Sequence, residues 1–275
     1  MAQTGIADVA NLIPKVWSSK FYDELRAQTM LLNLFSREYE GEIKSKGDQV
    51  NVSQIAVPTA TTLADDKTAF VPAAMGNSTF SLVADKQTVA AFEFTDLAQL
   101  QSISFMEEAK KALVESLKLK IEATLIAAYN AAVTGFVIAT PNDCSVADIV
   151  KARTNLSKLK VPMNDRYLIL DPEYAGNLLS KNQIISLDYI NNDVTASGQV
   201  NPKIMGFNVL EHNGLGTKSA MAFHKSAVQM VTQRDVQIKI SDLHSNNKLG
   251  YVMSADIIWG YKIFDATRAE RLKNA

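Results

Sequence analysis

Residues capable of acid–base or metal chemistry are scarce in this chain, and they do not fall into a known catalytic spacing. The histidines are His212, His224 and His244, and no HxxxH or HExxH pattern joins any of them. A zinc site or a general acid–base pair needs such side chains brought together with carboxylates or thiolates. We interpret the three histidines as loop and strand-end residues, and we predict no catalytic residue, no metal site and no cofactor.

The single cysteine, Cys144, follows Asp143 in a turn and lacks the surroundings of a nucleophile. A reactive thiolate needs a neighbouring base and a cationic environment, and no motif supplies either. The chain also lacks the GxSxG, GxGxxG and GxxxxGKS/T patterns of hydrolases, dinucleotide-binding enzymes and nucleoside triphosphatases. The sequence therefore favours a protein that is not an enzyme.

Composition further limits the class of protein to which this chain can belong. The chain has 275 residues, 47% of them hydrophobic and 21% charged, with a formal net charge of −1. This is enough for one large domain or two modest ones, and the near-neutral charge argues against a dedicated nucleic-acid-binding protein. No apolar run approaches the roughly 20 residues of a membrane span, and no signal peptide is recognisable. A lone cysteine suits a reducing compartment, so we expect folding in the cytoplasm without export.

Residues 39–94 alternate like strands but carry too few apolar side chains to form a core. Apolar residues alternate over 50–55 and again over 80–94, and the stretch 57–77 between them is irregular. We predict an extended β-hairpin with an irregular tip. Because an isolated two-stranded hairpin is at best marginally stable in water, we expect this one to rest on another protein surface.

A long helix is predicted next. From Phe105 to about Ala132 the chain has neither glycine nor proline, and an apolar residue recurs every fourth position from Ala109 to Leu125. At 1.5 Å per residue such a helix is roughly 40 Å long. We interpret it as a spine that crosses the subunit.

The rest of the chain alternates helices and strands. Helices are predicted at 146–158 and 174–180, and strands at 167–170, 204–210, 220–223, 228–231, 236–240 and 251–264, before a charged tail at 267–275. A short, continuous apolar run such as 167–170 indicates a strand buried on both faces. The predicted fold class is therefore α+β.

The order of a few segments carries a family resemblance that covers most of the chain. The segments are Ile13–Trp17, Arg37–Gly41, Gly47–Val52, Phe105–Ala109, Arg166–Pro172, Lys203–Val209 and Ala255–Arg268. They run from an N-terminal arm through a long two-stranded loop and a spine helix to a mixed α/β domain and a returning strand. In this order they resemble the major capsid proteins of tailed bacteriophages, and it is the ordered set, not any one segment, that is specific.

The resemblance implies a function and a division of the chain. Copies would assemble into hexamers and pentamers that form the icosahedral head enclosing the phage genome. The N-terminal arm would be 1–38, and the extended loop, 39–94, would lie over an adjacent subunit. A peripheral domain would comprise 95–134 and 246–275, and a mixed α/β axial domain 135–245. The protein would occur in the virion capsid, and in the host cytoplasm before assembly.

The resemblance also implies partners. They are other copies of the chain, the portal, a decoration protein and packaged DNA in nonspecific contact, with no membrane. A separate scaffolding protein is expected, because no long charged helical extension precedes the arm. The alternatives are an encapsulin-like bacterial nanocompartment shell, an α/β enzyme, and another phage structural protein such as a decoration or tail subunit. Electron microscopy would separate tailed virions from small cages, and an enzyme would require a convergent polar pocket.

We predict that several residues contact neighbouring subunits, because they lie on segments that have no core of their own. For Trp17 and Phe92, packing on the same subunit is an equally weighted alternative. The aromatic candidates are Trp17, Phe70, Phe80 and Phe92, and the charged candidates are Lys44, Lys46, Asp65, Asp66 and Lys67.

Overall fold

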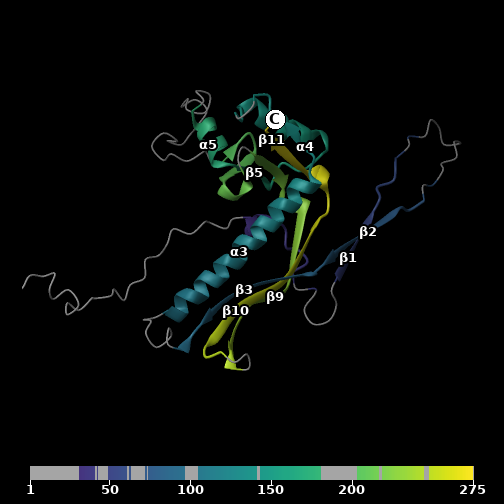
Figure 1. Ribbon diagram of the computed structural model, residues 1–275. Helices are drawn as coiled ribbons and strands as arrows, with labels where there is room; N and C mark the ends of the chain where they lie inside the picture. The colour runs from purple at the N-terminus through teal and green to yellow at the C-terminus, as the bar shows by residue number, and fades with distance from the viewer. Residues whose placement is uncertain are drawn as a thin grey trace, which may run out of the picture.

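The computed structural model (Figure 1) has a body built on two sheets, with a hairpin that projects from it. Of residues 105–107 only the backbone is described. The described residues are 31–40, 42, 49–60, 62, 72, 74–96, 105–140, 143–180, 203–216, 219–244 and 248–274.

The spine helix is confirmed as α3, Phe105–Ala132, with 28 residues. Its apolar stripe, from Ala109 through Leu117 to Leu125, is buried and packs along strands β3 (Lys86–Phe94) and β10 (Tyr251–Ile263). Neither α3 nor any other helix in the described ranges is long and apolar enough to cross a membrane.

A three-stranded antiparallel sheet lies against α3 in the order β3-β10-β9. The runs expected separately at 228–231 and 236–240 are one strand, β9 (Val228–Asp242), whose register against β10 shifts around Ile258. Residues 86–94, which the sequence placed in the extended loop, form β3 and pair with β10 instead. The reason is burial. When paired with β10, Phe94 lies opposite Tyr251 and is buried in the core under α3, whereas the projecting hairpin has no such core.

The second sheet has six strands in the order β4-β11-β8-β5-β7-β6. Helices α4 (Val146–Lys158) and α5 (Pro172–Leu179) pack on it through a core that contains Leu156, Leu168 and Tyr174. Its strands are β4 (Phe136–Val137), β5 (Arg166–Leu170), β6 (Lys203–Ile204), β7 (Phe207–Glu211), β8 (Ala220–His224) and β11 (Ala269–Lys273).

Two predictions for this sheet were wrong. The strand expected at 204–210 is broken at Met205 and Gly206, which both have positive φ (50° and 85°) and form a turn between β6 and β7. Two successive positive-φ residues are what a tight hairpin turn requires. The expected charged tail is strand β11, which lies between β4 and β8 because Ala269 and Leu272 fill buried positions.

The chain crosses between the two sheets at residues 224–228, from β8 into β9, and at residues 263–269, from β10 into β11. Residues 224–228 and 263–269 together are called the junction below. β9 therefore pairs with β10 in the three-stranded sheet, while β11 returns to the six-stranded sheet.

Candidate functional site: the hairpin and the groove at its base

The hairpin consists of β1 (Gln49–Ile55) and β2 (Asn77–Val83), paired antiparallel from Gln49 opposite Val83 to Ile55 opposite Asn77. In Figure 1 it extends away from α3 and from both sheets. Leu82 is the one buried residue of its two strands. Hydrogen bonds between the two strands therefore hold this element together, with little support from packing.

Apolar side chains are exposed at the far end of the hairpin. Ile55 is 61% exposed, Val57 93% and Met75 78%. Leaving such side chains in water forfeits roughly 1.5–3 kcal/mol each relative to full burial. Several of them on one projecting element indicate a surface that another molecule covers.

The base of the hairpin is anchored on the body. Leu82 and Ala84 are buried with Val231 of β9, and the rings of Tyr39 and Phe80 lie 6.0 Å and 5.7 Å from that of Phe264. These contacts place the hairpin beside the junction.

A groove of about 490 Å³ lies at this base, between the hairpin and the junction. Its walls combine aromatic rings with acidic, amide and basic side chains. They are formed by Glu38, Tyr39, Val52, Ser53, Gln54, Phe80, Ser226, Gln229, Phe264, Asp265 and Arg268.

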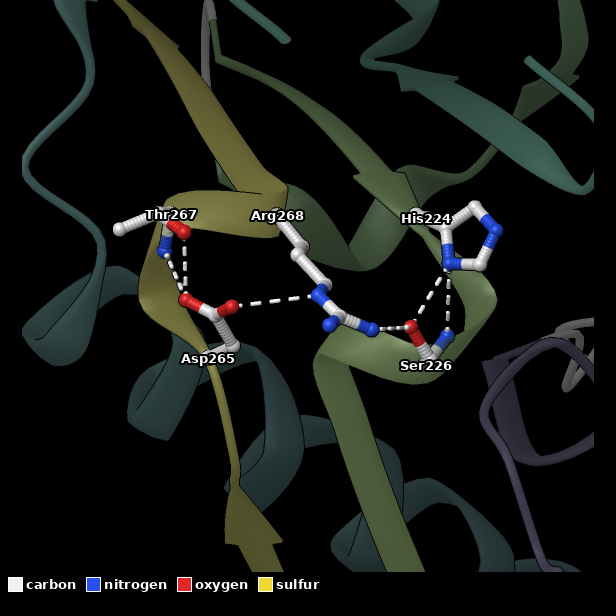
Figure 2. A network of polar contacts seen from close by, with 5 residues as sticks. All are labelled: His224, Ser226, Asp265, Thr267 and Arg268. Atoms are coloured by element: carbon white, nitrogen blue, oxygen red, sulfur yellow. Dashed lines mark hydrogen bonds and ion pairs between the residues drawn. The ribbon is translucent and has the colours of Figure 1, made fainter. Parts of the chain in front are cut away.

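One wall of the groove is held by a polar network in which Arg268 joins the two halves of the junction. Figure 2 shows this side chain between Asp265 and Ser226. Its Nε donates to Asp265 Oδ2 (3.1 Å) and its Nη1 to Ser226 Oγ (2.8 Å). The Ser226 hydroxyl lies 2.8 Å from His224 Nδ1, and the Thr267 amide donates to Asp265 Oδ1 (2.9 Å). Arg268 therefore links the start of β9 to the start of β11.

The protonation states fit this geometry. Burial, and then the charge of Arg268, lower the pKa of His224, so that its ring is the neutral acceptor that the Ser226 amide needs (3.2 Å). Burial acts to raise the pKa of Asp265, but hydrogen bonds from Thr267 and the charge of Arg268 together lower it. Asp265 is thus an anion that orients Arg268.

The described residues include two of the predicted contact residues. Phe80 is half-buried against Phe264 of the same chain and lines the groove, and Phe92 of β3 is 41% exposed. Contact of either with a neighbouring subunit stays a prediction. Trp17, Lys44, Lys46, Asp65, Asp66, Lys67 and Phe70 lie outside the described residues.

Sequence reasoning missed a buried polar cluster on α3. Glu122, 2% exposed, accepts the backbone N–H of Leu31 through Oε1 (2.8 Å), and its Oε2 lies 3.0 Å from His212 Nε2. The Gly214 amide donates to His212 Nδ1 (2.9 Å), which leaves the ring proton on Nε2 to donate to Glu122. His212 does follow a strand, β7, but it is buried. Its partner is 90 residues away in the sequence, and no local pattern joins the two.

Within the described ranges, no three His, Cys, Asp or Glu side chains come together as a metal site would require. Burial and the neighbouring Asp148 and Asp143 raise the pKa of Cys144 to about 12. Its thiol is therefore protonated and unreactive at neutral pH.

Comparison with known proteins decides the family. The model of the phage capsid protein family matches residues 98–270, from just before the spine helix into β11. The chain belongs to the phage capsid protein family. As a phage capsid protein it is a structural component of the virion and not an enzyme, and its copies associate to form the icosahedral head.

Solved structures share the fold over nearly the whole chain. A chain of Mycobacterium phage Che8 has a TM-score of 0.80 at 23% identity, covering 96% of this chain and 97% of that one. The capsid of cyanophage P-SCSP1u also gives 0.80, at 17% identity, with 100% and 95% covered. The mature capsid of bacteriophage PhiM1 gives 0.66 at 12% identity, with 94% and 92% covered. No curated protein matches the chain. The capsid protein therefore has the tailed-phage capsid fold.

Proposed function

We propose that this capsid protein is the subunit of hexamers and pentamers, and that its hairpin rests on an adjacent copy. In this assignment the three-stranded sheet with α3 is the peripheral domain, and the six-stranded sheet with α4 and α5 is the axial domain. The exposure of Ile55, Val57 and Met75 at the far end of an element with one buried residue carries the proposal. A neighbouring copy is the surface that a shell supplies to every subunit.

The register of the hairpin allows a sharp test. Ile55 lies opposite Asn77, so residues 56–76 can be replaced by Asn-Gly, the sequence that a two-residue hairpin turn favours. The anchored base, with Leu82 and Val231, is untouched. We expect a soluble, folded subunit that forms no closed shells in electron micrographs. Shells in normal yield would contradict the role given to the hairpin.

A double variant, Val57→Ser with Met75→Ser, removes only the exposed apolar side chains. It should lower the yield of particles while leaving the urea midpoint of the isolated subunit unchanged, because neither side chain is buried there. Met163→Ser, at another exposed apolar residue outside the hairpin, is the matched control. Equal particle yields for both variants would argue against a docking role of the hairpin tip.

We also propose nonspecific contact with packaged DNA through α3. Lys110, Lys111 and Lys118 surround Val114 in a shallow depression of the helix surface. One of these lysines, Lys111, is already paired with Glu108 (2.8 Å). Phosphate contacts of this kind weaken steeply with salt. Loss of salt-dependent DNA binding in Lys110→Ala with Lys118→Ala would support the assignment, and unchanged binding would oppose it.

A further inference from the structure

The groove at the base of the hairpin contains a buried acceptor without a donor. Gln229, 3% exposed, lines the groove, and no described group donates to its side-chain Oε1. A buried polar atom left without a hydrogen bond costs roughly 1–3 kcal/mol, so nearly all such atoms in native proteins have a partner. Gln229 Oε1 is therefore a buried acceptor for which the described residues of the chain supply no donor.

The charge of the groove indicates that this donor is cationic. Arg268 is the only cation that the described residues contribute to the wall, and it is engaged with Asp265 and Ser226. The second carboxylate of the wall, Glu38, is exposed and has no ion-pair partner among the described residues. The described residues of the wall thus carry two carboxylates and one guanidinium, a net charge of −1.

The aromatic walls favour a long side chain with a cationic end. Tyr39, Phe80 and Phe264 provide apolar faces along which an alkyl stem can lie, and ring faces attract cations within about 6 Å. A lysine meets both conditions, because its ammonium donates in three directions. Lysine is also the more abundant cation of the chain, 21 residues against 7 arginines.

We propose that the groove binds a lysine side chain of a second copy of this chain, with the ammonium between Glu38 and Gln229 Oε1. The inference rests on the proposed function, which brings copies into contact at the hairpin. No lysine lines the groove among the residues that the structure describes. Because the walls come from the hairpin, from Glu38–Tyr39 and from the junction, this lysine would fix the angle between hairpin and body across the interface.

Zero-length cross-linking tests the contact directly. Unlabelled and ¹⁵N-labelled full-length chains are co-assembled, and the particles or capsomers are treated with a carbodiimide, which joins a carboxylate only to an amine in direct contact. We expect a peptide that joins Glu38 to a lysine, with one half labelled and the other not. A Glu38 link found only within equally labelled pairs would overturn the proposal, and so would the absence of any Glu38 link.

Two variants test how much this contact contributes to the stability of the particles. Glu38→Gln should leave the unfolding midpoint of the subunit unchanged and lower the urea concentration at which particles dissociate, whereas Glu211→Gln, an exposed carboxylate outside the groove, is the control. Gln229→Leu should leave the subunit as stable or more stable, because it removes an unpaired buried acceptor, yet still weaken the particles. Wild-type particle stability in both would overturn the proposal. Failure of the wild-type chain to associate at all would instead refute the proposed function.

Discussion

Removal of the Glu122 carboxylate tests how the segment at Leu31 is held to the body. Glu122→Ala takes away the acceptor of two buried donors, the Leu31 amide and His212 Nε2. Leu31 opens the short helix α1 (Leu31–Leu34) and is itself fully buried. The substitution therefore removes the side chain that joins α1, the spine helix and the loop after β7.

The magnitude follows from the two unpaired donors. Each buried donor left without a partner costs about 1–3 kcal/mol, so two cost about 2–6 kcal/mol. We expect Glu122→Ala to lower the free energy of unfolding by about 4 kcal/mol, the middle of this range.

Glu122→Gln separates geometry from charge. Its amide offers one oxygen and one NH₂ group, and both the Leu31 amide and His212 Nε2 are donors. The glutamine oxygen can therefore accept one of the two hydrogen bonds, while its NH₂ group faces the second donor and cannot bond to it. We expect a loss of about 2 kcal/mol, half that of the alanine variant.

The assay is urea unfolding of the unassembled subunit, followed by the fluorescence of the buried Trp259. Glu115→Ala, a half-buried carboxylate on the same helix, is the control and should fall within about 0.5 kcal/mol of wild type. Hydrogen exchange at the Leu31 amide should accelerate in Glu122→Ala. Equal stability of the Glu122 and Glu115 alanine variants, or a glutamine variant as stable as wild type, would refute the role of the cluster.

Other substitutions probe the packing of the body. Gly260→Ala should destabilise the subunit by about 3 kcal/mol in urea unfolding, because a Cβ there would overlap the carbonyl oxygen of Val83. A wild-type urea midpoint would contradict this close approach of the two backbones. Cys144 should resist thiol reagents at pH 8 until urea unfolds the chain, since burial raises its pKa to about 12; rapid labelling of the folded subunit would contradict this. Tyr129→Phe should lower the free energy of unfolding by only about 1 kcal/mol, because its hydroxyl shares one proton between the carbonyl oxygens of Ala222 and Glu270, two residues that the sheet also pairs with each other. A loss above about 3 kcal/mol would mean that the hydroxyl is essential to the core.

Local patterns were enough to predict the elements that bury one continuous face. The four-residue period gave the spine helix α3 with both ends, and the apolar run before Pro172 gave β5. What local patterns could not show was which strands pair across long sequence distances. The alternating pattern of residues 86–94 is compatible both with a strand of the hairpin and with pairing to β10. The burial of Phe94 beneath α3 favours the pairing with β10.

Short and amphipathic strands were the other source of error. In β11, charged residues lie between the buried residues Ala269 and Leu272. In the sequence this pattern resembles a solvated tail, because two buried side chains are too few to indicate a strand. The strand is recognisable only from its place in the sheet, between β4 and β8. The sequence did predict the hairpin in outline, as an extended element with too few apolar residues to form a core. The groove at its base was not predicted, because Glu38, Gln229 and Arg268 come from three separate segments of the chain.

The most direct test is a cryo-electron-microscopy reconstruction of the particles that the full-length chain forms. The β1–β2 hairpin of each copy should lie across the body of the next copy, with Ile55, Val57 and Met75 covered by that neighbour. Closed particles in which the hairpin folds back on its own subunit, with those side chains still in solvent, would contradict the account.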